Sequence, residues 1–105
     1  MARSNSGVLA KSAVLCSQKA VVKRVSVDNT GGSAAYLMLF DAAALPANGA
    51  EPAFERSVAT VSLGEISFGE AGENFTSGLV AALSSTPAVL TLVGTDVGWF
   101  QATYY

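Results

Sequence analysis

The sequence contains no histidine, one cysteine and three prolines, and only 13% of its 105 residues are charged. Histidine, cysteine and converging carboxylates supply most acid–base and nucleophilic catalysis. The lack of histidine excludes Ser-His-Asp and Cys-His pairs and removes the usual ligands of a zinc site. The single cysteine, Cys16, cannot form an internal disulfide. We therefore expect a protein that is not an enzyme and that uses no cofactor and no metal.

Long apolar runs are also missing. The longest, residues 34–40, has only the length of a strand, whereas a membrane-spanning helix needs about 20 apolar residues. Near the amino terminus, polar residues such as Lys11 and Gln18 interrupt each apolar stretch, so the apolar run of a secretory signal is not seen. These patterns predict a protein with no membrane segment that is made in the cytoplasm.

What the chain does have is apolar surface. Half of its residues are hydrophobic, and they lie in short runs separated by Gly, Pro, Asn and Asp. The net charge of −2 gives only weak repulsion between copies. Apolar surface beyond the needs of one core is usually covered by subunit contacts. The composition therefore predicts a homo-oligomer.

The spacing of the apolar runs predicts strands. They are expected over residues 7–17, 20–28, 34–41, 54–63, 66–68, 75–84, 88–95 and 97–105. Seven or eight short strands with frequent turn signals are typical of an all-β, single-domain antiparallel β-sandwich or small barrel. Residues 1–6 are expected to be a flexible tail and residues 7–105 the domain. A helix over residues 77–83 is the alternative at one place, because Leu79 and Leu83 are four residues apart.

Turn signals predict how these strands pair. The Gly-rich turn at residues 29–33 is expected to join residues 20–28 and 34–41 in a hairpin, with Val21, Val25 and Val27 on one face of the first strand. A second hairpin is expected around Asp96 and Gly98. Residues 34–41 are apolar on both faces, as in a central strand covered on each side. Residues 42–52, with two prolines and an Asn-Gly pair, are expected to form a long surface loop.

The carboxyl-terminal segment is the first candidate for a binding surface. On a strand, Trp99, Gln101, Thr103 and Tyr105 share one face, and Phe100, Ala102 and Tyr104 share the other. One face is expected to be core and the other a stripe that binds sugar, peptide or a neighbouring subunit, since aromatic side chains supply large contact areas. The alternative is that both faces are core. The loop at residues 42–52 is the second candidate, because its prolines reduce the entropy lost on docking. The candidate interface residues are Trp99, Phe100, Tyr104, Tyr105, Leu45, Pro46, Asn48 and Pro52.

The charged residues point to no ligand of their own. Lys11, Lys19, Lys23 and Arg24 gather in the first quarter of the chain without interleaved aromatic residues, and the isoelectric point is acidic. We therefore expect no nucleic-acid partner. The carboxylates at residues 65, 70 and 73 lack the spacing of a calcium-binding loop and are expected to form a solvated turn.

Several runs resemble those of small structural proteins of tailed bacteriophages. They are YLMLFD at residues 36–41, LPANG at 45–49, EP at 51–52, FTSGL at 75–79 and ALSST at 82–86. The resemblance covers about residues 20–105 and is a pattern of apolar and turn residues. It contains no catalytic residues.

The resemblance implies an all-β component of the virion, synthesised in the host cytoplasm and present in many copies. It favours a capsid decoration protein that binds a lattice already built by another protein. Tail, neck and head-fibre components fit almost as well. The implied partners are a major capsid or tail protein and further copies of the chain, with a trimer as one form. The rival from another class is a host-surface carbohydrate-binding module that uses the carboxyl-terminal aromatic residues as a stacking platform.

Overall fold

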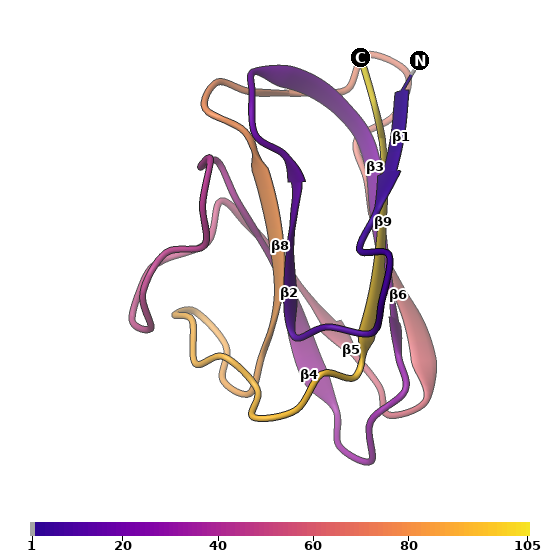
Figure 1. Ribbon diagram of the computed structural model, residues 1–105, viewed down its shortest axis with the longest axis vertical. Helices are drawn as coiled ribbons and strands as arrows, with labels where there is room; N and C mark the ends of the chain where they lie inside the picture. The colour runs from indigo at the N-terminus through magenta and orange to yellow at the C-terminus, as the bar shows by residue number, and fades with distance from the viewer. Residues whose placement is uncertain (1) are drawn as a thin grey trace.

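The computed structural model describes residues 2–105 as an antiparallel β-sandwich, without helices in that range (Figure 1). Its strands are β1 (Ala2–Asn5), β2 (Ser12–Cys16), β3 (Ala20–Asn29), β4 (Ala35–Phe40), β5 (Phe54–Val58), β6 (Ser62–Ser67), β7 (Glu73–Phe75), β8 (Leu79–Ser84) and β9 (Gly98–Tyr104). The predicted fold class is confirmed. The strands number nine within this range, because residues 2–5 add β1, residues 75–84 divide between β7 and β8, and residues 88–95 form no strand.

The strands form two sheets. The five-stranded sheet has the order β1-β9-β3-β6, with β7 also paired to β3, and the four-stranded sheet has the order β2-β8-β4-β5. Ala2 lies opposite Tyr104 in the β1–β9 pair, so the two chain ends lie side by side at one end of the sandwich (Figure 1). Residues 77–83 belong mostly to strand β8, which settles the alternative of a helix there in favour of a strand.

The segment expected to be a flexible tail contains a strand. Residues 2–5 pair with β9 in antiparallel register, from Ala2 opposite Tyr104 to Asn5 opposite Gln101. Their side chains are small or polar and mostly exposed, so hydrophobicity could not reveal the strand. It forms because β9 offers its free backbone edge.

Neither predicted hairpin forms. β3 pairs with β9 on one edge and with β6 and β7 on the other, so it has no free edge for β4, which lies in the other sheet. Residues 88–95 do not form a strand, apart from a single bridge between Ser84 and Leu92. Pro87 cannot donate a ladder hydrogen bond, and Ala88 has a positive φ of 71°. The turn signals were therefore correct, but these turns carry the chain between layers.

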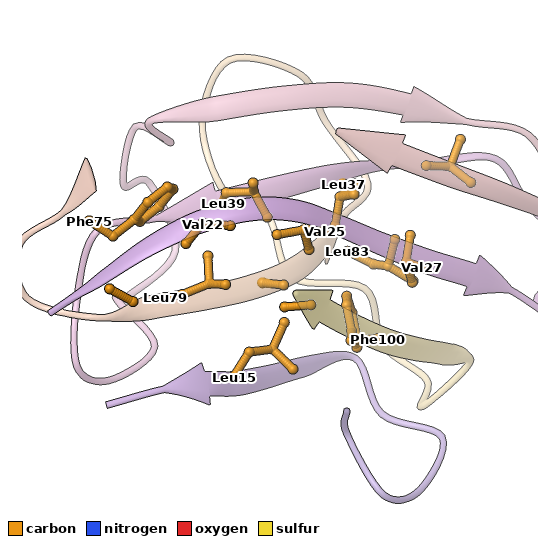
Figure 2. Close-up of a cluster of buried hydrophobic side chains, with 14 of the residues drawn as sticks. Leu15, Val22, Val25, Val27, Leu37, Leu39, Phe75, Leu79, Leu83 and Phe100 are labelled. Atoms are coloured by element: carbon orange, nitrogen blue, oxygen red, sulfur yellow. The ribbon is translucent and has the colours of Figure 1, made fainter. Parts of the chain in front are cut away.

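The main core lies between the two sheets (Figure 2). The close-up shows side chains from both sheets meeting there: Val22, Val25, Val27 and Phe100 from the five-stranded sheet, and Leu15, Leu37, Leu39, Leu79 and Leu83 from the four-stranded sheet. At one end, the rings of Phe54, Phe68 and Phe75 pack edge-to-face or tilted against one another, with ring centroids 4.7 to 6.1 Å apart. Each ring adds a large apolar area to this end of the core.

A second apolar cluster covers the other face of the four-stranded sheet. It consists of Met38, Phe40, Val80, Ala82 and Leu90, with Leu45 and Leu92 packed against it. Residues 41–53 and 85–97 supply this cover, and backbone hydrogen bonds tie the two segments together, as from Gly49 N–H to the Leu90 carbonyl at 2.7 Å. Strand β4 is thus buried on both faces, as predicted.

Candidate binding surface

The outer face of the five-stranded sheet is bare, in contrast to that of its partner sheet. The strand register fixes its rows. The row nearest the chain ends is Arg3–Thr103–Arg24–Ser67, the next is Asn5–Gln101–Ser26–Glu65, and the third is Trp99–Asp28–Leu63. Most of these side chains are exposed. We call this set of residues the bare face.

The carboxyl-terminal strand divides between core and bare face as one alternative predicted. Phe100 and Ala102 are buried in the main core, and Tyr104 packs partly against it. Trp99 is half-buried on the bare face, and Tyr105 is 60% exposed at its end. Of the four aromatic candidates, Phe100 is therefore a core residue that a partner cannot reach without unfolding the strand. Trp99 and Tyr105 remain accessible.

The loop at residues 42–52 is part of the fold. Leu45 packs against the second apolar cluster, and the Asn48 Oδ1 accepts a hydrogen bond from the backbone N–H of Leu92 at 3.0 Å. Pro46 and Pro52 are half-buried. The loop is folded onto the sheet rather than extended from it, so only its outer rim is available to a partner.

One corner of the bare face carries accessible apolar side chains around Asp28. Leu63 and Trp99 flank Asp28 from opposite sides, and Val61 lies in the turn just before Leu63. Val61 is 76% exposed and Leu63 is 63% exposed. Val61 also has a φ of +49°, a left-handed conformation that is strained for a β-branched residue. We call Val61, Leu63 and Trp99 the apolar corner. The sequence placed Val61 and Leu63 inside one long strand and so gave no sign of it.

Hydrogen bonds hold the turns beneath this corner. The buried Asn29 donates from Nδ2 to the carbonyl oxygens of Ser33 and Ala59, and its Oδ1 accepts from the N–H of Gly31. Thr30 donates from its N–H and its hydroxyl to the Val97 carbonyl, at 2.9 and 2.7 Å. These bonds join the ends of β3 and β5 to the start of β9. The apolar corner is therefore preorganised.

The opposite end of the bare face is basic because of a β-bulge in β3. Register with β9 shifts between Val22 and Arg24. Val22 and Val25 both point into the core although they are three residues apart, which corrects the expected alternation from Val21. Lys23 and Arg24 consequently line the same outer hollow, together with Arg3. Half of the chain's six basic residues thus gather at one place.

Asp41 lies away from the bare face, and its carboxylate has a structural role. Its carboxylate accepts hydrogen bonds from the N–H of Ser77 at 2.8 Å and from the N–H and hydroxyl of Thr76 at 3.0 and 3.1 Å. The bonds from Ser77 and Thr76 hold the pKa of Asp41 below its usual value of 3.8. This carboxylate ties the start of the loop to the turn before β8.

Over residues 2–105, no group of three or more acidic, cysteine or histidine side chains converges in a way that could hold a metal ion. The same range contains no helix with the length and apolarity of a membrane span. Comparison of the chain with models of known protein families, with curated proteins and with solved structures finds no match. The structure therefore defines a class of protein. It is an antiparallel β-sandwich in which the chain's own loops cover the outer face of the four-stranded sheet and leave the outer face of the five-stranded sheet bare.

Proposed function

We propose that this chain is a non-enzymatic structural protein of a tailed bacteriophage virion. Its most direct role is a multi-copy capsid decoration protein that binds a lattice built by another protein. The sequence runs at residues 36–41 and 75–86 support this role through their resemblance to such proteins. The asymmetry of the sandwich supports it as well, because a module that covers one sheet with its own loops presents the other sheet to a partner.

The apolar corner is the observation that carries the proposal. A β-branched residue in the left-handed region costs on the order of 1–3 kcal/mol, and Val61 also exposes its side chain to water. Both costs would be offset if Val61, Leu63 and Trp99 entered an apolar recess on another virion protein, where such side chains act as anchors.

Purified virions of the phage that encodes the chain provide the test. Quantitative mass spectrometry should find the chain in many copies per particle, and the density from electron cryo-microscopy should lie on the outside of the capsid lattice. Density at the tail or neck would overturn the decoration role and retain the virion role. Particles that lack the chain would overturn both.

The Val61→Asn variant tests the surface itself. Asparagine tolerates the left-handed region, so the variant should be at least as stable as the wild type but should bind bare capsids more weakly. Val14→Asn is the matched control, because Val14 is an exposed valine on β2 in the other sheet. Equal capsid binding by wild type and Val61→Asn would remove the apolar corner from the contact.

A host-surface carbohydrate-binding module is the second candidate function. The observation in its favour is the middle row of the bare face, where Asn5, Gln101 and Ser26 line one hollow beside the aromatic side chain of Trp99. Amide and hydroxyl groups match the donors and acceptors of sugar hydroxyls, and an aromatic ring offers a stacking surface.

A further inference from the structure

We propose that the basic end of the bare face binds an acidic oligosaccharide, with Arg3 and Arg24 holding its carboxylate or sulfate group. The inference rests on the second candidate function and is independent of any capsid contact. The site consists of two adjoining hollows of about 370 and 460 Å³ that share Arg3, Arg24 and Thr103. We call these two hollows the basic hollow.

The cations reach this place through specific structural devices. Arg3 arrives on β1, the strand that adds to the free edge of β9. Lys23 and Arg24 are consecutive residues, and in a regular strand they would point to opposite faces. The β-bulge between Val22 and Arg24 places both on the hollow instead. Bulges commonly redirect side chains next to functional sites. These three basic residues make this part of the surface positive, although the net charge of the chain is −2.

Arg3 and Arg24 are spaced to share one anion. Both lie opposite Thr103, one on each side of β9. Two strand spacings separate their Cα atoms by about 10 Å, so the long side chains can converge above Thr103. A guanidinium group offers paired N–H donors that match a carboxylate or a sulfate oxygen pair. Lys23 adds a third positive charge, and its Nζ lies 4.9 Å from the centre of the Tyr105 ring.

The rest of the ligand would follow β9 away from this end. One row along lie Asn5, Gln101 and Ser26, and the next row brings Trp99. Successive rows are about 7 Å apart. The order along the strand is therefore anion site, hydroxyl-binding site and stacking site. A short oligosaccharide with one acidic ring fits this order.

Nearby carboxylates argue against a nucleic acid. Glu70 lines the basic hollow, and the Glu65 Oε2 lies 3.9 Å from the Arg24 Nε. A polyanion would have to pass these carboxylates, and three cations make a small footprint compared with the extended basic faces that bind nucleic acids. A ligand with one anionic group and neutral hydroxyls avoids this repulsion.

The test is titration of the purified protein, followed by amide chemical shifts in NMR spectra and by Trp99 fluorescence. The probes are maltotriose with one ring oxidised to a uronate, maltotriose carrying one sulfate group, neutral maltotriose and a short single-stranded DNA. We expect saturable binding of at least one acidic saccharide, and the better of the two identifies the anion as carboxylate or sulfate. Arg3→Gln and Arg24→Gln should each weaken it about tenfold.

Arg56→Gln is the matched control, since Arg56 is exposed on β5 in the other sheet and should leave affinity unchanged. Circular dichroism should show all three variants folded. If maltotriose binds as well as the acidic sugars, the carbohydrate module stands and the anion site is overturned. If DNA binds more tightly than either acidic saccharide, a nucleic acid replaces the sugar as ligand. If no probe binds, or if the arginine variants bind like wild type, the proposal is overturned, whereas capsid binding is unaffected by any of these results.

Discussion

The side-chain amide of Asn29 donates a hydrogen bond to the backbone carbonyl of Ala59 at 3.2 Å, across thirty residues of sequence and between the ends of β3 and β5. Because β3 and β5 belong to different sheets, this bond fastens one layer of the sandwich to the other. Asn29 is only 1% exposed and uses both of its side-chain polar atoms. Its hydrogen bonds hold together the turns beneath the apolar corner.

Asn29→Ala should therefore be strongly destabilising. It removes the partner of the Ser33 and Ala59 carbonyl groups and of the Gly31 N–H group, whose bonds to Asn29 are partly buried, which costs on the order of 1–3 kcal/mol of unfolding free energy. Chemical denaturation measures the loss. Asn74→Ala, at an exposed position on β7, is the control and should change stability little. Equal stabilities of the two variants would show that water replaces the Asn29 bonds.

The two sheets approach each other closely at Gly64. A Cβ atom at this position would lie far inside van der Waals contact with the Val58 Cγ2. Gly64→Ala should lower the unfolding free energy by about 1–3 kcal/mol, as overpacking of a core does. The double variant Gly64→Ala/Val58→Ala should recover part of this loss, because it removes the methyl groups that clash. Additive losses in the double variant would mean that backbone movement, and not the Val58 contact, sets the cost.

The second apolar cluster predicts a role in stability for the loop at residues 42–52. Leu45 covers the cluster that contains Met38 and Phe40, so Leu45→Ser should lower the unfolding free energy by roughly 1–2 kcal/mol. Ala47→Ser, at an exposed position in the same loop, is the control. Thermal unfolding of both variants distinguishes this structural role from a loop that only contacts partners. In the latter case Leu45→Ser would unfold like the control.

The sequence allowed the fold class to be predicted because alternation of apolar residues survives in most strands. The sequence did not reveal which strands pair with one another. Nothing in the pattern around residues 29–33 tells whether a glycine-rich turn closes a hairpin or carries the chain to the other sheet, since both need the same backbone conformations. That choice depends on which strands occupy the edges of β3, and those strands are distant in sequence.

The same limit applies to the bare face. The carboxyl-terminal alternation placed Trp99 and Phe100 on opposite faces of a strand but did not tell which face is core, and the structure puts Phe100 in the core and Trp99 on the bare face. Arg3 and Arg24 could not be grouped, because they meet only through β9, which lies at the other end of the chain. The bulge at Lys23 was also hidden, since one extra residue in a strand leaves no mark in composition. The candidate site thus depends on the pairing of strands that are distant in sequence, and a single sequence does not show that pairing.

The hydrogen bonds on Asp41 predict how stability depends on pH. Because they lower the pKa of Asp41 in the folded state, the carboxylate contributes stability that is present above its unfolded pKa near 3.8 and is lost as pH falls through the lower folded value. Asp41→Asn should thus lower the unfolding free energy at neutral pH, by about 1 kcal/mol or less since the group is exposed. Denaturation at a series of pH values should show this difference shrinking as the pH falls below 3.8 and through the lower folded pKa of Asp41, since wild-type Asp41 becomes protonated there as well. Glu51→Gln, a change at an exposed carboxylate in the loop, should give a difference that is small at every pH. A difference for Asp41→Asn that stays constant throughout the acid range would show that the bonds from Ser77 and Thr76 do not distinguish the charged carboxylate from the neutral one.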